Sequence, residues 1–72
     1  MNKDLWMKVQ QKLADRGLYK LDIDGIPGTG TRAALKAWQR NGGLPLTFPP
    51  DARSLRMLGL EPPKQSDLIV PP

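Results

Sequence analysis

The sequence predicts an all-α domain, a small three-helix bundle with a glycine-rich central loop, and three observations lead to this fold class. Apolar residues recur at helical spacing in three segments. Glycine and proline separate those segments. The chain has 72 residues and no cysteine, so one small core stabilised by helix packing is all that its length allows.

The first helix is expected to begin near Asn2 or Asp4, because short polar side chains cap the free N–H groups of a helix start. Its apolar spacing predicts a buried face made of Leu5, Trp6, Val9 and Leu13. Gly17 is expected to end this helix in the left-handed conformation, with Leu18 folding back onto the helix.

Residues 19–23 alternate apolar and polar side chains, which favours either a short strand or an irregular loop. The glycine-rich loop follows, and Asp24 is expected to accept hydrogen bonds from its backbone N–H groups. Thr29 or Thr31 is expected to cap the next helix. The residues predicted to hold the loop in shape are Asp24, Gly25, Gly28 and Thr31.

The second helix has an apolar stripe at helical spacing, formed by Thr31, Ala34, Leu35 and Trp38, and it is expected to end at residues 41–43. This stripe predicts that Trp38 belongs to the core. A basic row on the opposite face consists of Arg32, Lys36 and Arg40. The row is either a solvated helix face or a contact surface for an anionic ligand.

The third helix is expected to follow the proline-rich loop at residues 45–50. Asp51 fits as its N-cap, and Gly59 with Leu60 repeats the glycine-leucine stop of the first helix. Leu55 and Leu58 should point inward. The domain is therefore expected to span residues 1–60, and residues 61–72, which contain four prolines, are interpreted as a proline-rich linker or tail.

Lysine and arginine number 11 against 7 acidic residues, which gives a formal net charge of +4. This charge favours anionic partners, which include nucleic acid, acidic lipid surfaces and the bacterial wall. No run of about 18 apolar residues could span a membrane, and the N-terminus lacks the apolar stretch of a signal peptide. The chain as given is expected to be soluble.

Three short motifs suggest other functions, but each lacks a necessary part. Residues 28–33 match G-x-G-x-x-A, whereas a dinucleotide site needs a βαβ unit of about 30 residues. Residues 25–31 have the spacing of a phosphate-binding loop without its lysine. Asp22 and Asp24 lack the further ligands of a calcium loop. Because the chain has no histidine and no cysteine, we expect no catalysis, no metal site and no cofactor.

These residues resemble the type 1 peptidoglycan-binding domain, a three-helix module attached to bacterial and phage cell-wall hydrolases. The likeness covers roughly residues 5–60. The first helix and its turn match through Val9, Gln10, Leu13, Gly17, Leu18 and Tyr19. The centre matches through Asp24, Gly25, Gly28, Thr31, Ala34, Leu35, Trp38 and Gln39. The end matches through Gly43, Leu44, Pro45, Asp51, Ser54, Leu55 and Leu58.

The resemblance implies a non-catalytic module that binds peptidoglycan, through its stem peptide or its glycan, and targets an attached lytic or wall-remodelling enzyme to its substrate. It also implies a location in the cell wall or periplasm. Two alternatives remain open at this point: a small basic nucleic-acid-binding domain, which could present one helix to a major groove, and a protein-docking module.

A stem peptide carries carboxylates and short apolar side chains, so its receptor should combine an aromatic edge with cationic or amide donors. We expect this ligand site in a groove between the first turn and the second helix, formed by Tyr19, Asp22, Arg32, Lys36 and Gln39. Gln39 has a structural alternative, in which its amide bonds the backbone.

Overall fold

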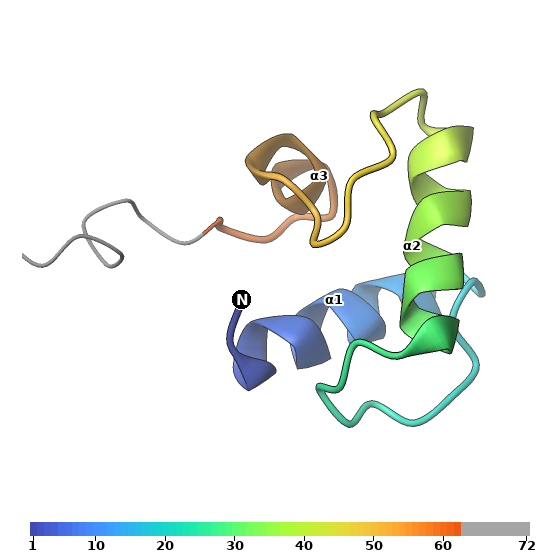
Figure 1. Cartoon of the computed structure of the whole chain (residues 1–72), viewed down its shortest axis with the longest axis vertical. Helices are drawn as coiled ribbons and strands as arrows, with labels where there is room; N and C mark the ends of the chain where they lie inside the picture. The colour runs from blue at the N-terminus through green and yellow to red at the C-terminus, as the bar shows by residue number, and fades with distance from the viewer. Residues whose placement is uncertain (63–72) are drawn as a thin grey trace, which may run out of the picture.

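A computed structural model of the chain describes residues 1–62, which form three helices and no strand. The helices are α1 (Lys3–Asp15), α2 (Thr29–Asn41) and α3 (Ala52–Met57). In Figure 1, α2 runs steeply across α1, and the loop between them passes beneath α1 before α2 begins. The predicted all-α, three-helix class is confirmed. Most of the expected tail, residues 63–72, lies outside the described residues.

Two of the three helices begin with the side-chain cap that the sequence predicts. The Asn2 side chain accepts a hydrogen bond from the Leu5 N–H at 2.8 Å, and Asp51 accepts one from the Ser54 N–H at 2.9 Å. The start of α2 differs, because its N-cap is Gly28, which has no side chain to accept a hydrogen bond. The expected cap by Thr29 or Thr31 is therefore wrong, since both residues already lie inside the first turn.

All three helices end in the same way, with a glycine at positive φ followed by a leucine whose N–H donates to the carbonyl five residues earlier. The glycines are Gly17 (φ 75°), Gly43 (φ 69°) and Gly59 (φ 85°). The closing hydrogen bonds are Leu18 N to Leu13 O (3.0 Å), Leu44 N to Gln39 O (2.8 Å) and Leu60 N to Leu55 O (2.9 Å). These are the stops predicted from the sequence.

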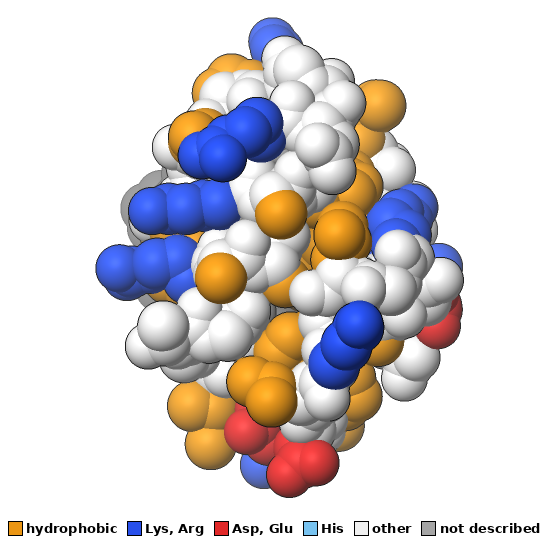
Figure 2. Space-filling model, turned by 90° about the vertical axis from the view of Figure 1, so that its right-hand side faces the viewer, with side chains coloured by type: hydrophobic (Ala, Val, Ile, Leu, Met, Phe, Trp, Pro, Cys, Tyr) orange, Lys and Arg blue, Asp and Glu red, His pale blue; other side chains and the backbone are white. Residues whose placement is uncertain are grey.

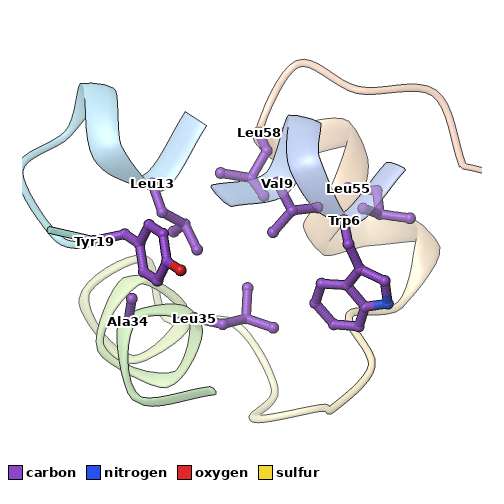
Figure 3. Packing of buried hydrophobic residues seen from close by; sticks show 8 residues of the cluster. All are labelled: Trp6, Val9, Leu13, Tyr19, Ala34, Leu35, Leu55 and Leu58. Atoms are coloured by element: carbon purple, nitrogen blue, oxygen red, sulfur yellow. The ribbon is translucent and has the colours of Figure 1, made fainter. Parts of the chain in front are cut away.

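The core gathers side chains from all three helices and from the first loop (Figure 3). Its buried members are Trp6, Val9, Leu13, Tyr19, Ala34, Leu35, Leu55 and Leu58. Leu5 and Trp38, which were expected among them, are only partly buried and pack against the cluster from outside. Trp38 is the last member of the apolar stripe of α2 and lies at the margin of the cluster.

The segment 19–23 forms an irregular loop, the second of the two conformations that its alternation allowed. Tyr19 is buried, whereas the Leu21 side chain is 64% exposed. Figure 3 shows the Tyr19 ring close to Leu13 of α1 and Ala34 of α2, so this ring fills the space between the two helices. Among residues 1–62, no helix is long and apolar enough to cross a membrane.

Candidate functional site

A fully buried glutamine of α1, Gln10, holds the loop between α1 and α2. Its Oε1 accepts a hydrogen bond from the Gly25 N–H at 2.8 Å. Its Nε2 lies within hydrogen-bonding distance of four oxygens: Tyr19 Oη (3.3 Å), Asp24 Oδ1 (3.1 Å), Ile26 O (3.1 Å) and Thr31 Oγ1 (3.0 Å). One side chain therefore joins α1, the whole loop and the first turn of α2.

Asp24 folds the loop back on itself. Its Oδ1 accepts from the Ile26 N–H at 2.9 Å as well as from the Gln10 amide. These two hydrogen bonds lower the pKa of the Asp24 carboxyl below its ordinary value because they favour the charged form, and the bond from the Ile26 N–H has the larger effect. The carboxylate is therefore ionised at neutral pH and fixed in direction.

Gly25 permits the loop to lie against the beginning of α1. Its φ is 75°, and a Cβ at this position would lie 2.9 Å from the Lys3 carbonyl oxygen and 2.5 Å from Lys3 Cγ. No other residue type fits both this backbone conformation and this close approach. Gly30 has a related role at the start of α2, because a Cβ there would overlap the Leu21 side chain.

The loop so held encloses an open hollow of about 370 Å³ at the beginning of α2. Its lining consists of Tyr19, Lys20, Leu21, Asp22, Asp24, Ile26, Gly28, Thr29, Gly30 and Thr31. Two apolar side chains of this lining, Leu21 and Ile26, are each 64% exposed. The hollow thus combines exposed apolar surface with one ammonium group, that of Lys20, and two carboxylates.

The structure brings together only part of the predicted ligand set. Tyr19 and Asp22 line the hollow, whereas Arg32, Lys36 and Gln39 are not part of its lining. Tyr19 is 5% exposed and its hydroxyl donates to the Asp22 carbonyl oxygen at 2.6 Å, so its ring offers no free aromatic edge. The five residues do not line one hollow within the described residues, because Arg32 and Lys36 are exposed on α2 and Gln39 is buried.

Gln39 has the structural role that was its alternative. It is fully buried, and its Nε2 donates toward Thr47 O, Thr47 Oγ1 and Ser54 Oγ, each at 3.1 Å. Thr47 Oγ1 also accepts from the Asp51 N–H at 3.2 Å. Gln39 therefore connects α2 to the loop at residues 44–51 and to α3. Its Oε1 is buried and has no partner within the described residues.

Arg32 and Lys36 lie on the exposed side of α2 together with Arg40. The Arg32 guanidinium carbon is 4.6 Å from the centroid of the Phe48 ring, and this ring is tilted against Trp6 at 5.4 Å between centroids. Figure 2 views this side of the molecule, where Lys and Arg side chains line one edge and acidic side chains gather at the lower end.

The central role of Gln10 and most of the lining of the hollow were not predicted from the sequence. A signal for Gln10 was present, because it lies four residues after Trp6 and three before Leu13 and therefore on the buried side of the helix. For Leu21 and Ile26 there was none, since the spacing of apolar residues in a loop does not say which of them face solvent. Within residues 1–62, no group of three or more candidate ligands could hold a metal ion.

The structure is thus a small helical domain of three short helices. A buried glutamine fixes each of its two connecting loops, and the first loop forms an open hollow on the surface. Comparison with known proteins gives its family. The model of the family described as putative peptidoglycan binding domain matches residues 2–58, and the chain belongs to this family.

One curated relative is similar to the chain, the putative OxPP cycle protein OpcA of Synechococcus elongatus. The two are 45% identical over 49 residues, which cover 68% of this chain and 11% of the relative. The chain thus spans about a tenth of the length of that protein. No solved structure matches the chain.

Proposed function

We propose that this domain binds peptidoglycan and holds an attached lytic or wall-remodelling enzyme on its substrate in the cell wall or periplasm. The observation that carries the proposal is family membership, since the family model covers residues 2–58 of 72. Tethering raises the local concentration of substrate around a catalytic domain without any new contact by that domain. Weak binding by the module is sufficient for this role.

The hollow at the beginning of α2 is the site that we assign to the wall ligand. A stem peptide has short apolar side chains, a carboxylate and, in many walls, a free amine. Leu21 and Ile26 offer exposed apolar surface to the short side chains, while Lys20 and Asp22 offer opposite charges to the two ionised groups. Of the ligand residues predicted from the sequence, we assign Asp22 to ligand binding, and the buried Tyr19 ring forms part of the wall of the hollow.

Retention on purified sacculi tests the proposal. The variant Leu21→Ser with Ile26→Ser removes the exposed apolar surface and should leave the core intact. We expect about a tenfold loss of retention, which corresponds to the apolar area of two partly covered side chains. The matched control is Leu46→Ser with Met57→Ser, which changes side chains that are 51% and 60% exposed elsewhere on the surface. Equal retention of the two variants would place the ligand outside the hollow.

A soluble muropeptide added to a labelled domain gives a second, direct readout. The amide signals that shift should belong to residues 19–31, the lining of the hollow. If the shifts cluster instead on α3 or on residues 44–51, the assignment of the site is wrong even where retention on sacculi persists.

A second candidate function is docking to a protein partner. The observation that favours it is the relative from Synechococcus elongatus, whose name describes it as a putative OxPP cycle protein and mentions no cell wall. The sacculus experiment separates the two candidates at moderate salt, where charge attraction is screened and a docking module should show no retention on sacculi.

A further inference from the structure

The exposed side of α2 carries a row of three cations that is separate from the hollow. Arg32, Lys36 and Arg40 are all exposed and recur every four residues. Successive members are therefore about 6 Å apart along the helix axis. None of the three belongs to the lining of the hollow. The row is a second surface with its own chemistry.

No acidic residue interrupts this row. α2 has the sequence TGTRAALKAWQRN, with three cations and no carboxylate. By contrast, α1 contains Asp4 and Asp15 as well as its lysines, and the N-cap of α3 is the acidic residue Asp51. α2 is thus the one helix of residues 1–62 without an acidic residue in the helix or its cap, and charge complementarity points to a linear anionic partner.

Arg32 is also held in place. Its guanidinium lies over the Phe48 ring at 4.6 Å, so part of the side-chain freedom that an anion would otherwise have to restrict is already lost. A stacked guanidinium keeps its N–H donors at the edge of its plane, where they can reach a phosphate oxygen. Two of the three cations are arginines, the residue best suited to paired contacts with phosphate.

The same stack argues against recognition of bases. Single-stranded nucleic acid is bound by free aromatic rings on which the bases stack, in addition to a cationic track. Phe48 has Arg32 over its ring and Trp6 beside it at 5.4 Å, so it offers no such free platform. The row therefore provides contacts for a phosphate backbone and no stacking surface for bases.

We propose that Arg32, Lys36 and Arg40 bind a linear phosphodiester polymer without bases, of the polyol-phosphate type found in bacterial walls. This binding is independent of the hollow, so that peptidoglycan and the phosphodiester chain can be engaged together. Each cation neutralises one phosphate and releases its counterion, which makes the affinity depend steeply on salt.

Titration with polyglycerol phosphate of defined length tests the proposal. For three phosphates on a flexible chain, the logarithm of the binding constant should fall with the logarithm of salt concentration at a slope of about −2, that is, about 20-fold between about 50 mM and about 200 mM salt. The variant Arg32→Gln with Lys36→Gln and Arg40→Gln should bring this slope close to zero. A variant that keeps the slope overturns the proposal.

Two further variants separate position from charge and from folding. Lys3→Gln with Lys8→Gln and Arg16→Gln removes the same charge from α1 and the residue after it, where the side chains are exposed, and should keep the slope. Arg32→Lys with Arg40→Lys keeps the charge and should also keep it. An equal loss in the α1 control would mean that only net charge acts.

The same titration with nucleic acid distinguishes a base-free phosphodiester polymer from DNA or RNA as the partner of the row. A single-stranded oligonucleotide and a short duplex with the same number of phosphates should bind no more tightly than polyglycerol phosphate. Tighter binding of either, lost in the α2 variant, would overturn the proposal in favour of a nucleic-acid contact. Sacculi stripped of phosphodiester polymers should retain the α2 variant as well as the wild type, so failure here is distinct from failure at the hollow.

Discussion

The two connecting loops of the domain are held by the same residue type in different ways. Gln10 and Gln39 are both fully buried and both use Nε2 to bond the loop that follows their helix. Gln10 also receives the Gly25 N–H on Oε1, whereas the Oε1 of Gln39 has no partner within residues 1–62. Because an unpaired buried acceptor offsets part of what the other bonds contribute, the first loop should be the more firmly fixed. It is also the loop that forms the hollow.

The largest effect is expected from Gln10→Leu, which keeps the volume and removes both polar ends. The buried Gly25 N–H and several loop oxygens then lose their partner, so the free energy of unfolding should fall by about 3 kcal/mol. Urea unfolding at low temperature measures this. A loss below about 1 kcal/mol would show that the loop stays in shape without the glutamine.

Two glycine substitutions compare the loops at the backbone. Gly25→Ala combines positive φ with the close approach to Lys3, whereas Gly43→Ala has positive φ and nothing within 4 Å of the new Cβ. We expect a cost of about 2 kcal/mol for the first and about 1 kcal/mol for the second. The difference between the two urea midpoints measures how tightly the first loop contacts α1. Equal midpoints would mean that Lys3 moves aside freely.

The third comparison is Gln39→Leu, the counterpart of the Gln10 substitution. It removes the hydrogen bonds to Thr47 and Ser54 but also removes the unpaired Oε1, so part of the loss is offset. The expected cost is only about 1 kcal/mol. A cost equal to that of Gln10→Leu, measured in the same urea series, would contradict the difference drawn between the loops.

The smallest effect on stability is expected from lowering the pH. The pKa of Asp24 is lowered mainly by the hydrogen bond from the Ile26 N–H, and the pKa of Asp51 is lowered mainly by that from the Ser54 N–H. Both carboxylates thus contribute stability that is complete above the ordinary pKa of about 4 and is lost as the pH falls through the lower value of the folded state.

The variant Asp24→Asn should therefore show a flatter dependence of the urea midpoint on pH below about 4, while its dependence above about 5 is unchanged. Asp51→Asn provides the same measurement for the second loop. A wild-type midpoint that stays constant down to about pH 2 would contradict the assigned role of both carboxylates.

The helices could be predicted from the sequence because their limits are local. Asn2 and Asp51 cap within three residues, and each glycine-leucine stop closes within six residues. The loops could not, because Gln10 reaches residues 9 to 21 positions away and Gln39 reaches Ser54 at a separation of 15. Helical spacing places each glutamine on the buried side of its helix, but nothing within its local window identifies the distant loop groups that its amide bonds.

The self-contained helix stops have a consequence for how such domains diversify. Since the hydrogen bonds that end α1 and α2 lie inside the helix and the three residues that follow it, the chain beyond Tyr19 or beyond Leu44 can change in length without moving the end of the helix. Exchange of residues 20–23, which include no hydrogen-bond partner of Gln10, is then a way to give the same three helices a new surface. Grafting a loop of different length between these fixed points should yield a folded domain with altered ligand preference.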